Sequence, residues 1–384
     1  MSTDSAGMRL QHMVSACAVF QPPKRNPGVQ GHHGPARHRL PFARPPPYQR
    51  GMTRALRIAV QMDVLETINV AGDSTFALML EAQARGHRLW HYLPDHLHWF
   101  DGRVVADARA VEVMRPAGEG QPHFRWLDAR QRLALAGDID VVLMRQDPPF
   151  DMGYITATHL LELAQAAGVT VVNDPASVRN APEKLFVLNY ADLMPPTLVT
   201  RSLGAAQAFR ERHGEVVVKP LYGNGGAAVF HVPAGDSNLP ALVEMFTQVW
   251  REPFMVQAFL PDVAKGDKRI VLIDGEPVGA INRLPKDGEI RSNLAAGGSA
   301  HATALTPEEE VICARLGPDL KRLGLIFVGI DVIAGRLTEI NVTSPTGIVA
   351  IDRFNGTNIP GLFWGRVEAI RAGAIRVGAI RVGG

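Results

Sequence analysis

The chain has 384 residues, enough for two or three domains, and its 46% hydrophobic and 20% charged residues are typical of a globular enzyme. Its apolar runs are strand-length, well short of the roughly 20 residues that span a bilayer, which argues against a membrane protein. The net charge of +2 includes +7 from residues 1–54, so the rest carries 2 − 7 = −5, and a mildly acidic body is not typical of nucleic-acid binding.

Residues 1–54 hold eight prolines and show no sustained periodicity, so they cannot bury enough apolar surface to offset the entropy of ordering. We predict a disordered, basic, proline-rich tail that is dispensable up to Met52. The two cysteines, Cys17 and Cys313, give no disulfide framework and indicate a reducing compartment, so we expect a cytoplasmic protein. Cys313 lies in an apolar helical pattern, which favours a place in the core over a role as nucleophile.

From Leu56 onward the pattern alternates between strands and helices. Strands are predicted over 56–63, 87–93, 139–147 and 169–174, and helices from Ser74 to Gly86 and over 154–167. Such alternation is typical of a parallel sheet covered by helices. Ligands bind these sheets at the carboxyl ends of the strands, so Asp63 and residues 145–151 are binding candidates, with ordinary loop charges as the alternative.

The second region pairs a strand lysine with a glycine loop. Predicted helices carry Lys184 and cover 203–213, and predicted strands cover 215–221 and 254–260. Lys219 follows three valines, and a buried ammonium needs a partner. The glycines of loop 222–226 allow positive φ and close approach to an anion. The pattern predicts a phosphate clamp, with an ordinary flexible turn as the alternative. The sequence has neither the spacing of a Walker A loop nor that of a dinucleotide-binding fingerprint, so the clamp is of another kind.

The last region ends in a predicted hairpin over 326–346, after a long predicted loop at 286–302 and a helix that Thr306 caps. A turn centred on Gly335 places Ile333 opposite Leu337 and Asp331 opposite Glu339, with Asn341 on the same face. Two opposed carboxylates repel unless a cation lies between them, and oxygen ligands suit Mg²⁺. The hairpin therefore predicts a magnesium site, with a solvated polar face as the alternative.

Motifs spread over roughly residues 56–371 resemble those of the bacterial (prokaryotic-type) glutathione synthetase family in the ATP-grasp superfamily. They are VQMD, INVAGDSTFALMLEAQARG, LMRQDPPFD, NDPASVRNAPEKLF, KPLYGNGGAAVF, VQAFLP, GDKRIVLIDGEP, RSNLAAGG and FVGIDVIAGRLTEINVTSPTGI. The resemblance implies an α/β protein with the ATP-grasp fold, α+β in its ATP-binding part. It implies a parallel-sheet substrate-binding domain at 55–180, a central lid domain at 181–257 and a catalytic domain at 258–371, followed by a tail at 372–384.

The resemblance also implies a reaction: ATP-dependent ligation of γ-glutamylcysteine to glycine through an acyl phosphate, with release of ADP and phosphate. The implied cofactors are ATP and Mg²⁺, or Mn²⁺, and the implied assembly is a homo-oligomer, a dimer or a tetramer. No nucleic acid or membrane partner is implied. Two alternatives stay open: another ATP-grasp ligase that joins a carboxylate to an amine, and a catalytically silent ATP-binding regulator.

The roles implied for single residues fall into four groups. Charge stabilisation during phosphoryl transfer is implied for Lys219, Arg269 and Arg283. ATP binding is implied for Lys184, Lys219, Gly223, Asn224, Gly225, Gly226, Gln257, Phe259, Leu260 and Asp267. Binding of the peptide or glycine is implied for Asp63, Arg145, Arg291, Asn293, Gly297, Gly298, Ser344, Pro345 and Thr346. Metal binding is implied for Asp331, Glu339 and Asn341.

Two positions depart from the usual family pattern. Tyr222 stands where the common form has Asp, and Gln146 stands where it often has Lys. Both flank the motifs rather than replace them, so we expect them to change details of the site and not the activity.

Overall fold

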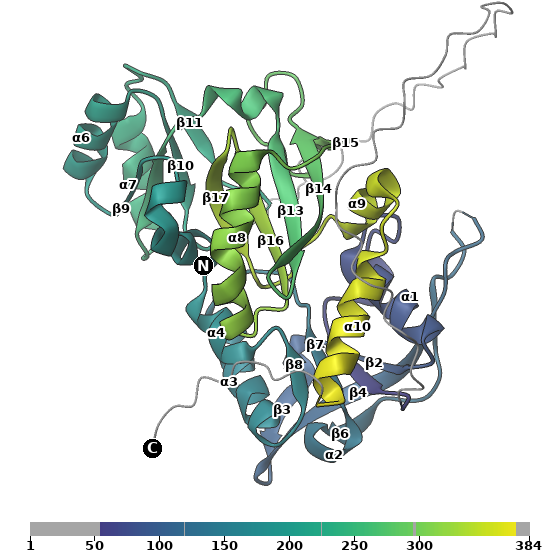
Figure 1. Cartoon of the computed structure of the whole chain (residues 1–384). Coiled ribbons are helices and arrows are strands. Elements are labelled where there is room, and N and C mark those ends of the chain that lie inside the picture. Colours follow the sequence, from purple (N-terminus) through teal and green to yellow (C-terminus); the bar gives the residue numbers. More distant parts are fainter. Residues whose placement is uncertain (1–53, 119, 224, 295–296, 374–384) are drawn as a thin grey trace, which may run out of the picture. The chain divides into compact units, whose positions relative to one another are not determined.

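The computed structural model describes residues 54–118, 120–223, 225–294 and 297–373, which build three β-sheets flanked by helices (Figure 1). Residues 1–53 of the tail predicted at 1–54, most of the tail predicted at 372–384, and Asn224 lie outside the described residues. None of the helices in the described ranges is both long and apolar enough to cross a membrane.

The first sheet has a parallel centre with an antiparallel extension. Its strand order is β3-β4-β2-β1-β7-β8, with β5 and β6 paired to β4. The four predicted strands are the parallel ones: β1 (Arg57–Gln61), β2 (Arg88–Tyr92), β7 (Val141–Met144) and β8 (Thr170–Val172). The antiparallel strands were not predicted: β3 (Leu97–Phe100), β4 (Arg103–Val113), β5 (Phe124–Trp126) and β6 (Gln131–Ala134). The sheet is therefore mixed rather than parallel throughout.

The first helix beside this sheet begins at Ser74, as the sequence predicts. The Asp73 side chain accepts a hydrogen bond from Phe76 N and caps α1 (Ser74–Ala84). The other helices of this region are α2 (Leu135–Asp138), α3 (Met152–Ala166) and α4 (Pro175–Asn180). The C-terminal helix α10 (Ile359–Arg371) lies beside α1, where Trp364 Nε1 donates to Leu78 O at 2.7 Å (Figure 1).

The second sheet is antiparallel and has its own core. Its order is β11-β10-β12-β9, from β9 (Thr197–Thr200), β10 (Val216–Pro220), β11 (Phe230–Val232) and β12 (Phe254–Ala258). Helices α6 (Leu203–His213) and α7 (Leu239–Val249) accompany it, and α5 (Glu183–Phe186) precedes it. Val218, Phe246 and Val256 are among the buried residues of this core. The predicted helix at 203–213 is confirmed at both ends.

The third sheet carries the predicted hairpin. Its antiparallel order is β15-β14-β13-β16-β17, from β13 (Asp267–Ile273), β14 (Glu276–Leu284), β15 (Ser299–Ala302), β16 (Phe327–Ile333) and β17 (Arg336–Asn341). Helices α8 (Pro307–Arg322) and α9 (Ile348–Asn355) belong to the same region, and Thr306 with Glu309 forms the predicted capping box. The prediction of one long loop at 286–302 is wrong at its end, because residues 299–302 pair with β14 as β15.

The hairpin register corrects one predicted pair and confirms another. Ile333 pairs with Arg336 rather than with Leu337, because Ala334 and Gly335 alone form the turn, both with positive φ. The register then shifts between Asp331 and Val332, which leaves Thr338 as an extra residue on β17. This bulge compensates for the shorter turn, so Asp331 still lies opposite Glu339 as predicted.

Cys313 is a core residue, as its helical pattern predicts. It lies in α8 and is buried in the same core cluster as Leu316 and Leu320. Burial raises the pKa of its thiol to about 12. A thiol in this state is not a nucleophile.

Candidate active site

One cavity is lined by strands of the second and third sheets and by the loop that follows β7 of the first sheet. Most of the predicted site residues line it: Lys184, Lys219, Gly223, Gly225, Gly226, Gln257, Phe259, Leu260, Asp267, Arg269, Arg283, Arg291, Asn293, Asp331, Glu339, Asn341, Ser344, Pro345 and Thr346. The structure therefore brings together residues that are up to 162 positions apart, from Lys184 to Thr346. Asp63, Arg145, Gly297 and Gly298 do not line it.

Two arginines hold Asp331 at the floor of this cavity. Arg269 lies opposite Asp331 across β13 and β16, and its Nε and Nη2 donate to the two carboxylate oxygens at 2.6 and 2.9 Å. Arg283 Nη2 lies 2.9 Å from the same carboxylate. Burial opposes ionisation of Asp331, but the two guanidinium groups outweigh it and hold the pKa of Asp331 well below its usual range.

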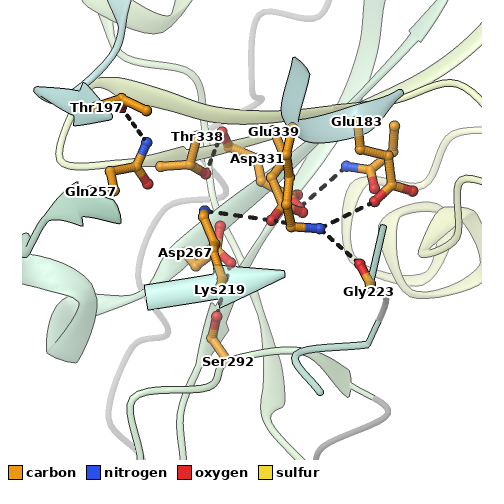
Figure 2. Close-up of polar contacts among 12 residues, drawn as sticks. Glu183, Thr197, Lys219, Gly223, Gln257, Asp267, Ser292, Asp331, Thr338 and Glu339 are labelled. Carbon is orange, nitrogen blue, oxygen red and sulfur yellow. Dashed lines mark hydrogen bonds and ion pairs between the residues drawn. The ribbon is translucent and has the colours of Figure 1, made fainter. Parts of the chain in front are cut away.

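Two lysines hold Glu339 more loosely. Lys184 Nζ lies 3.5 Å and Lys219 Nζ 3.6 Å from Glu339 Oε1. Figure 2 shows Lys219 pointing at Glu339 from β10, and Lys184 Nζ also donates to Gly223 O at 2.8 Å. Burial lowers the pKa of Lys219, while Glu339 and Glu183 outweigh burial at Lys184 and raise its pKa. The sequence predicts that buried Lys219 needs a partner for its ammonium group, and this partner is Glu339.

Two further carboxyl groups of the cavity have raised pKa values. Burial, reinforced by nearby Glu339 and opposed by Lys184, raises the pKa of Glu183 to about 7. Burial, opposed by Arg283 and reinforced by Asp331, raises the pKa of Asp267 to about 6. Asp267 accepts hydrogen bonds from Arg283 and Ser292 through Oδ2, while its buried Oδ1 has no partner among the described residues.

The donor chemistry of the hairpin fits a hard divalent cation. Asp331, Glu339 and Asn341 all offer oxygen atoms, and Glu339 Oε1 meets the lysines only at ion-pair distance. Arginines and lysines already neutralise the opposed carboxylates, so the repulsion between these carboxylates does not by itself require a metal. Within the described ranges, no group of three or more His, Cys, Asp or Glu side chains forms a metal cluster. The metal therefore stays a prediction.

The glycine loop and loop 286–298 approach each other at Gly226. Gly226 has φ +78°, and a Cβ there would lie 2.9 Å from Asn293 Oδ1 and 3.4 Å from Arg291 Cδ. Gly225 also has positive φ, but a Cβ there would meet no described atom within 4 Å. Gly226 is thus the position at which a side chain would push the two loops apart.

Gln257, Phe259 and Leu260, for which ATP binding is implied, lie at the end of β12. Gln257 Nε2 donates to Thr197 Oγ1 at 2.9 Å, and Phe259 N donates to Glu215 O at 2.9 Å (Figure 2 shows the Gln257 contact). The Phe259 ring stacks on His231 with centroids 4.0 Å apart. Side chains of β9 and β11 therefore hold this segment, and Phe259 lines the cavity.

Arg145 and Asp63 do not line the cavity but contact residues that do. Arg145 is buried; its Nη2 donates to Pro345 O at 2.9 Å and its Nε to Thr75 Oγ1 at 3.0 Å. Asp63 Oδ2 accepts from Asp147 N at 2.9 Å. Each supports a loop that lines the cavity. Gly297 and Gly298 donate to backbone carbonyls of residues 294 and 293 and shape the end of loop 286–298.

Sequence reasoning did not assign a role to Glu183, Ser292 or Thr343, which all line the cavity, whereas Asp147, from the binding candidates at 145–151, lines it as predicted. Thr343 Oγ1 lies 3.5 Å from Glu183 Oε1, and Ser292 Oγ donates to Asp267 at 2.9 Å. The position of Glu183 beside a predicted phosphate-binding lysine, Lys184, was the available signal. No such signal was available for Ser292, because its partner Asp267 is 25 residues away in the chain, on β13.

The two departures from the family pattern both make defined contacts. Tyr222 stacks on Phe150, with centroids 6.1 Å apart and planes 10° apart, so the glycine loop touches the loop after β7. Gln146 is buried and accepts a hydrogen bond from Gln61 Nε2. Neither contact displaces a predicted site residue.

Comparisons with known proteins agree on family and fold. The models of the prokaryotic glutathione synthetase N-terminal domain and ATP-grasp domain match residues 56–179 and 183–356. A glutathione synthetase of Brucella melitensis is 55% identical over 321 residues, 83% of this chain and 100% of its own length. One from Vibrio cholerae is 44% identical, over 82% of this chain and 97% of its own length. Among solved structures, the D-cycloserine synthetase DcsG has a TM-score of 0.57 at 15% identity, covering 81% of this chain and 99% of its own, which shows a shared fold.

Proposed function

The chain belongs to the prokaryotic glutathione synthetase family of ATP-dependent ligases, and from this premise we propose how its cavity makes glutathione from γ-glutamylcysteine and glycine. The observation that carries the proposal is the convergence of Lys184, Lys219, Arg269 and Arg283 on one cavity. Phosphoryl transfer is mostly positioning and neutralisation of charge, which such a set of cations supplies.

In the proposed reaction, an oxygen of the cysteinyl carboxylate attacks the γ-phosphorus of ATP, and the bond to the ADP oxygen breaks. The glycine nitrogen then attacks the acyl carbon, the amide bond forms and phosphate leaves with the carboxylate oxygen. Lys184 and Lys219 bind the phosphates, with the glycine loop above them. Arg269 and Arg283 neutralise charge on the transferred group.

Asp331, Glu339 and Asn341 would hold Mg²⁺ or Mn²⁺, which when bound neutralises phosphate charge. Because Glu339 holds its lysines only at 3.5 and 3.6 Å, those lysines can turn to phosphate oxygens when nucleotide binds. Gln257, Phe259 and Leu260 bind the adenine, and Asp267 faces the ribose side. The residues that bind the peptide and glycine are Arg291, Asn293, Gly297, Gly298 and 344–346, while Arg145 and Asp63 hold cavity-lining loops in place.

We keep three further expectations as part of the proposal. The working units are the substrate-binding domain 55–180, the lid 181–257 and the catalytic domain 258–371. The protein acts in the cytoplasm, where ATP and reduced thiols are available. It assembles as a dimer or tetramer, which light scattering coupled to size exclusion would measure.

Phosphate release with ATP, Mg²⁺, γ-glutamylcysteine and glycine, omitting each in turn, tests the proposal. We expect release to need all four, with ADP as the nucleotide product. A requirement for a different carboxylate or amine would assign another ligase of this fold. ATP binding without substrate-dependent release would assign a silent regulator.

A further inference from the structure

Asn173 forms a buried bridge between the first sheet and the hairpin that carries Asp331 and Glu339. It follows β8 directly and is only 4% exposed. Its Nδ2 donates to Phe327 O at 2.8 Å and to Val342 O at 2.7 Å, and its Oδ1 accepts from Phe327 N at 2.8 Å. One amide group thus satisfies three backbone groups at the open end of the hairpin.

The register of the hairpin explains why a side chain is needed there. The ladder between β16 and β17 ends at the pair Gly329–Asn341, so Phe327 has no partner in β17. Buried backbone groups need hydrogen-bond partners. Asn173 takes the place that a further β17 residue would fill, and its amide offers both a donor and an acceptor, as a backbone does.

The bridge also fixes how two parts of the site face each other. Val342 follows Asn341 directly, and it leads into the cavity-lining residues 343–347. Arg145, at the end of the neighbouring strand β7, holds the same segment through Pro345 O. The ends of β7 and β8 therefore both hold the segment that follows β17, although Asn173 itself does not line the cavity.

We propose that Asn173 is a positioning residue for the ligation: it sets the hairpin, where phosphoryl transfer occurs, against the first sheet, where the peptide binds. This inference rests on the proposed function. Misplacement of reacting groups by about 1 Å can lower a rate roughly 100-fold. Loss of the bridge should therefore lower kcat, while ATP binding, which uses β10, β12 and α5, should change little.

The test compares Asn173→Ser and Asn173→Ala with the control Trp364→Phe. The control removes another buried hydrogen bond, from Trp364 Nε1 to Leu78 O, which joins α10 to α1 away from the cavity. All variants are assayed well below their own Tm for kcat and for the KM of ATP, peptide and glycine. We expect both Asn173 variants to lose at least tenfold in kcat with the KM of ATP within twofold, and Trp364→Phe to lower Tm with kcat within twofold.

Each other outcome decides against the inference. If the Asn173 variants keep kcat and lose only Tm, as the control does, the bridge is structural and the proposal is overturned. If neither Asn173 variant yields a folded protein, the residue serves folding, and the proposal is equally overturned. If phosphate release by the wild-type enzyme does not depend on the peptide and glycine, the proposed function is refuted, whatever the variants do.

Discussion

Asp331 and Glu339 lie opposite each other on adjacent strands, yet a different pair of cations neutralises each carboxylate. The arginines hold Asp331 at hydrogen-bond distance and through a bidentate contact, whereas the lysines reach Glu339 only at 3.5 and 3.6 Å. Bidentate guanidinium pairs are the stronger and more rigid kind. Asp331 is therefore the fixed member of the pair, and Glu339 is the one that can exchange partners when nucleotide and metal bind.

We predict that Glu339→Gln keeps the fold and loses activity. The amide preserves shape but removes the charge that the two lysines and the proposed metal share, so phosphate release should fall about a hundredfold or more. Excess Mg²⁺ should restore it only in part. Glu310→Gln, on the exposed face of α8, is the control for charge loss. Near-normal turnover of Glu339→Gln would contradict the metal site and favour the alternative of a solvated polar face on the hairpin.

We predict that Gly226→Ala weakens ATP use more than Gly225→Ala. Both positions have positive φ and share the backbone strain of roughly 1 kcal/mol, but only the Cβ at 226 meets Asn293. The kcat/KM for ATP should fall about tenfold further in Gly226→Ala, equivalent to roughly 1.4 kcal/mol. Adding Asn293→Ala should recover part of that extra loss. Equal effects at the two glycines would show that the loops act independently.

The pKa of Glu183 predicts a pH dependence of stability in the absence of metal and nucleotide. Its pKa is raised from 4.5 to about 7 on folding, so between these values the folded state binds more protons than the unfolded state. Glu183 therefore stabilises the fold below about pH 4.5 and loses this contribution as pH rises through 7. Glu183→Gln should match the wild-type Tm at pH 5 more closely than at pH 8, where the variant should melt higher.

Thermal melts from pH 4.5 to 8.5 measure this difference. Glu211→Gln, on the exposed surface of α6, should follow the wild-type curve throughout. A Glu183→Gln curve parallel to the wild type would mean that Glu183 stays ionised in the folded protein.

We predict that loop 286–298 protects the acyl phosphate and closes over bound substrates, because water would otherwise hydrolyse the intermediate. Lys286 and Arg291 are the trypsin sites of this loop, and the Arg291 side chain is 38% exposed. Cleavage should be fast in the free enzyme and several-fold slower with ATP, Mg²⁺ and peptide together. Arg291→Gln should leave Lys286 as the one site to follow. The same rate with and without ligands would make the loop a static connector.

Sequence patterns predicted the helices and caps whose formation depends on residues close in the chain. The start of a helix at Ser74, the helix at 203–213 and the cap at Thr306 all depend on neighbouring residues, and all are present. The strands between 97 and 134 were not predicted because three of the four are only 3 or 4 residues long and exist by pairing with β4. Pairing partners are not readable from one short segment.

In the site, too, local sequence signals identified some residues, and contacts between distant strands determined the rest. Composition and spacing identified the opposed carboxylates Asp331 and Glu339, but not the cations that neutralise them. Arg269 meets Asp331 only because β13 pairs with β16 in one register, and Arg283 reaches Asp267 through the register of β13 with β14. A shift of one residue would turn these side chains to the other face. The family resemblance identified the site residues, whereas the strand register determines which of their side chains form ion pairs.

Cys313 has a pKa of about 12, so its buried thiol keeps its proton at any cellular pH. Thiolates, rather than thiols, are the nucleophiles that react with peroxides and disulfides. Oxidising conditions consume the thiol tripeptide that the proposed reaction makes, and they inactivate enzymes that carry exposed thiolates. Residues 54–118, 120–223, 225–294 and 297–373 present no exposed cysteine, so this part of the enzyme offers such oxidants no thiolate at the moment when demand for its product is highest.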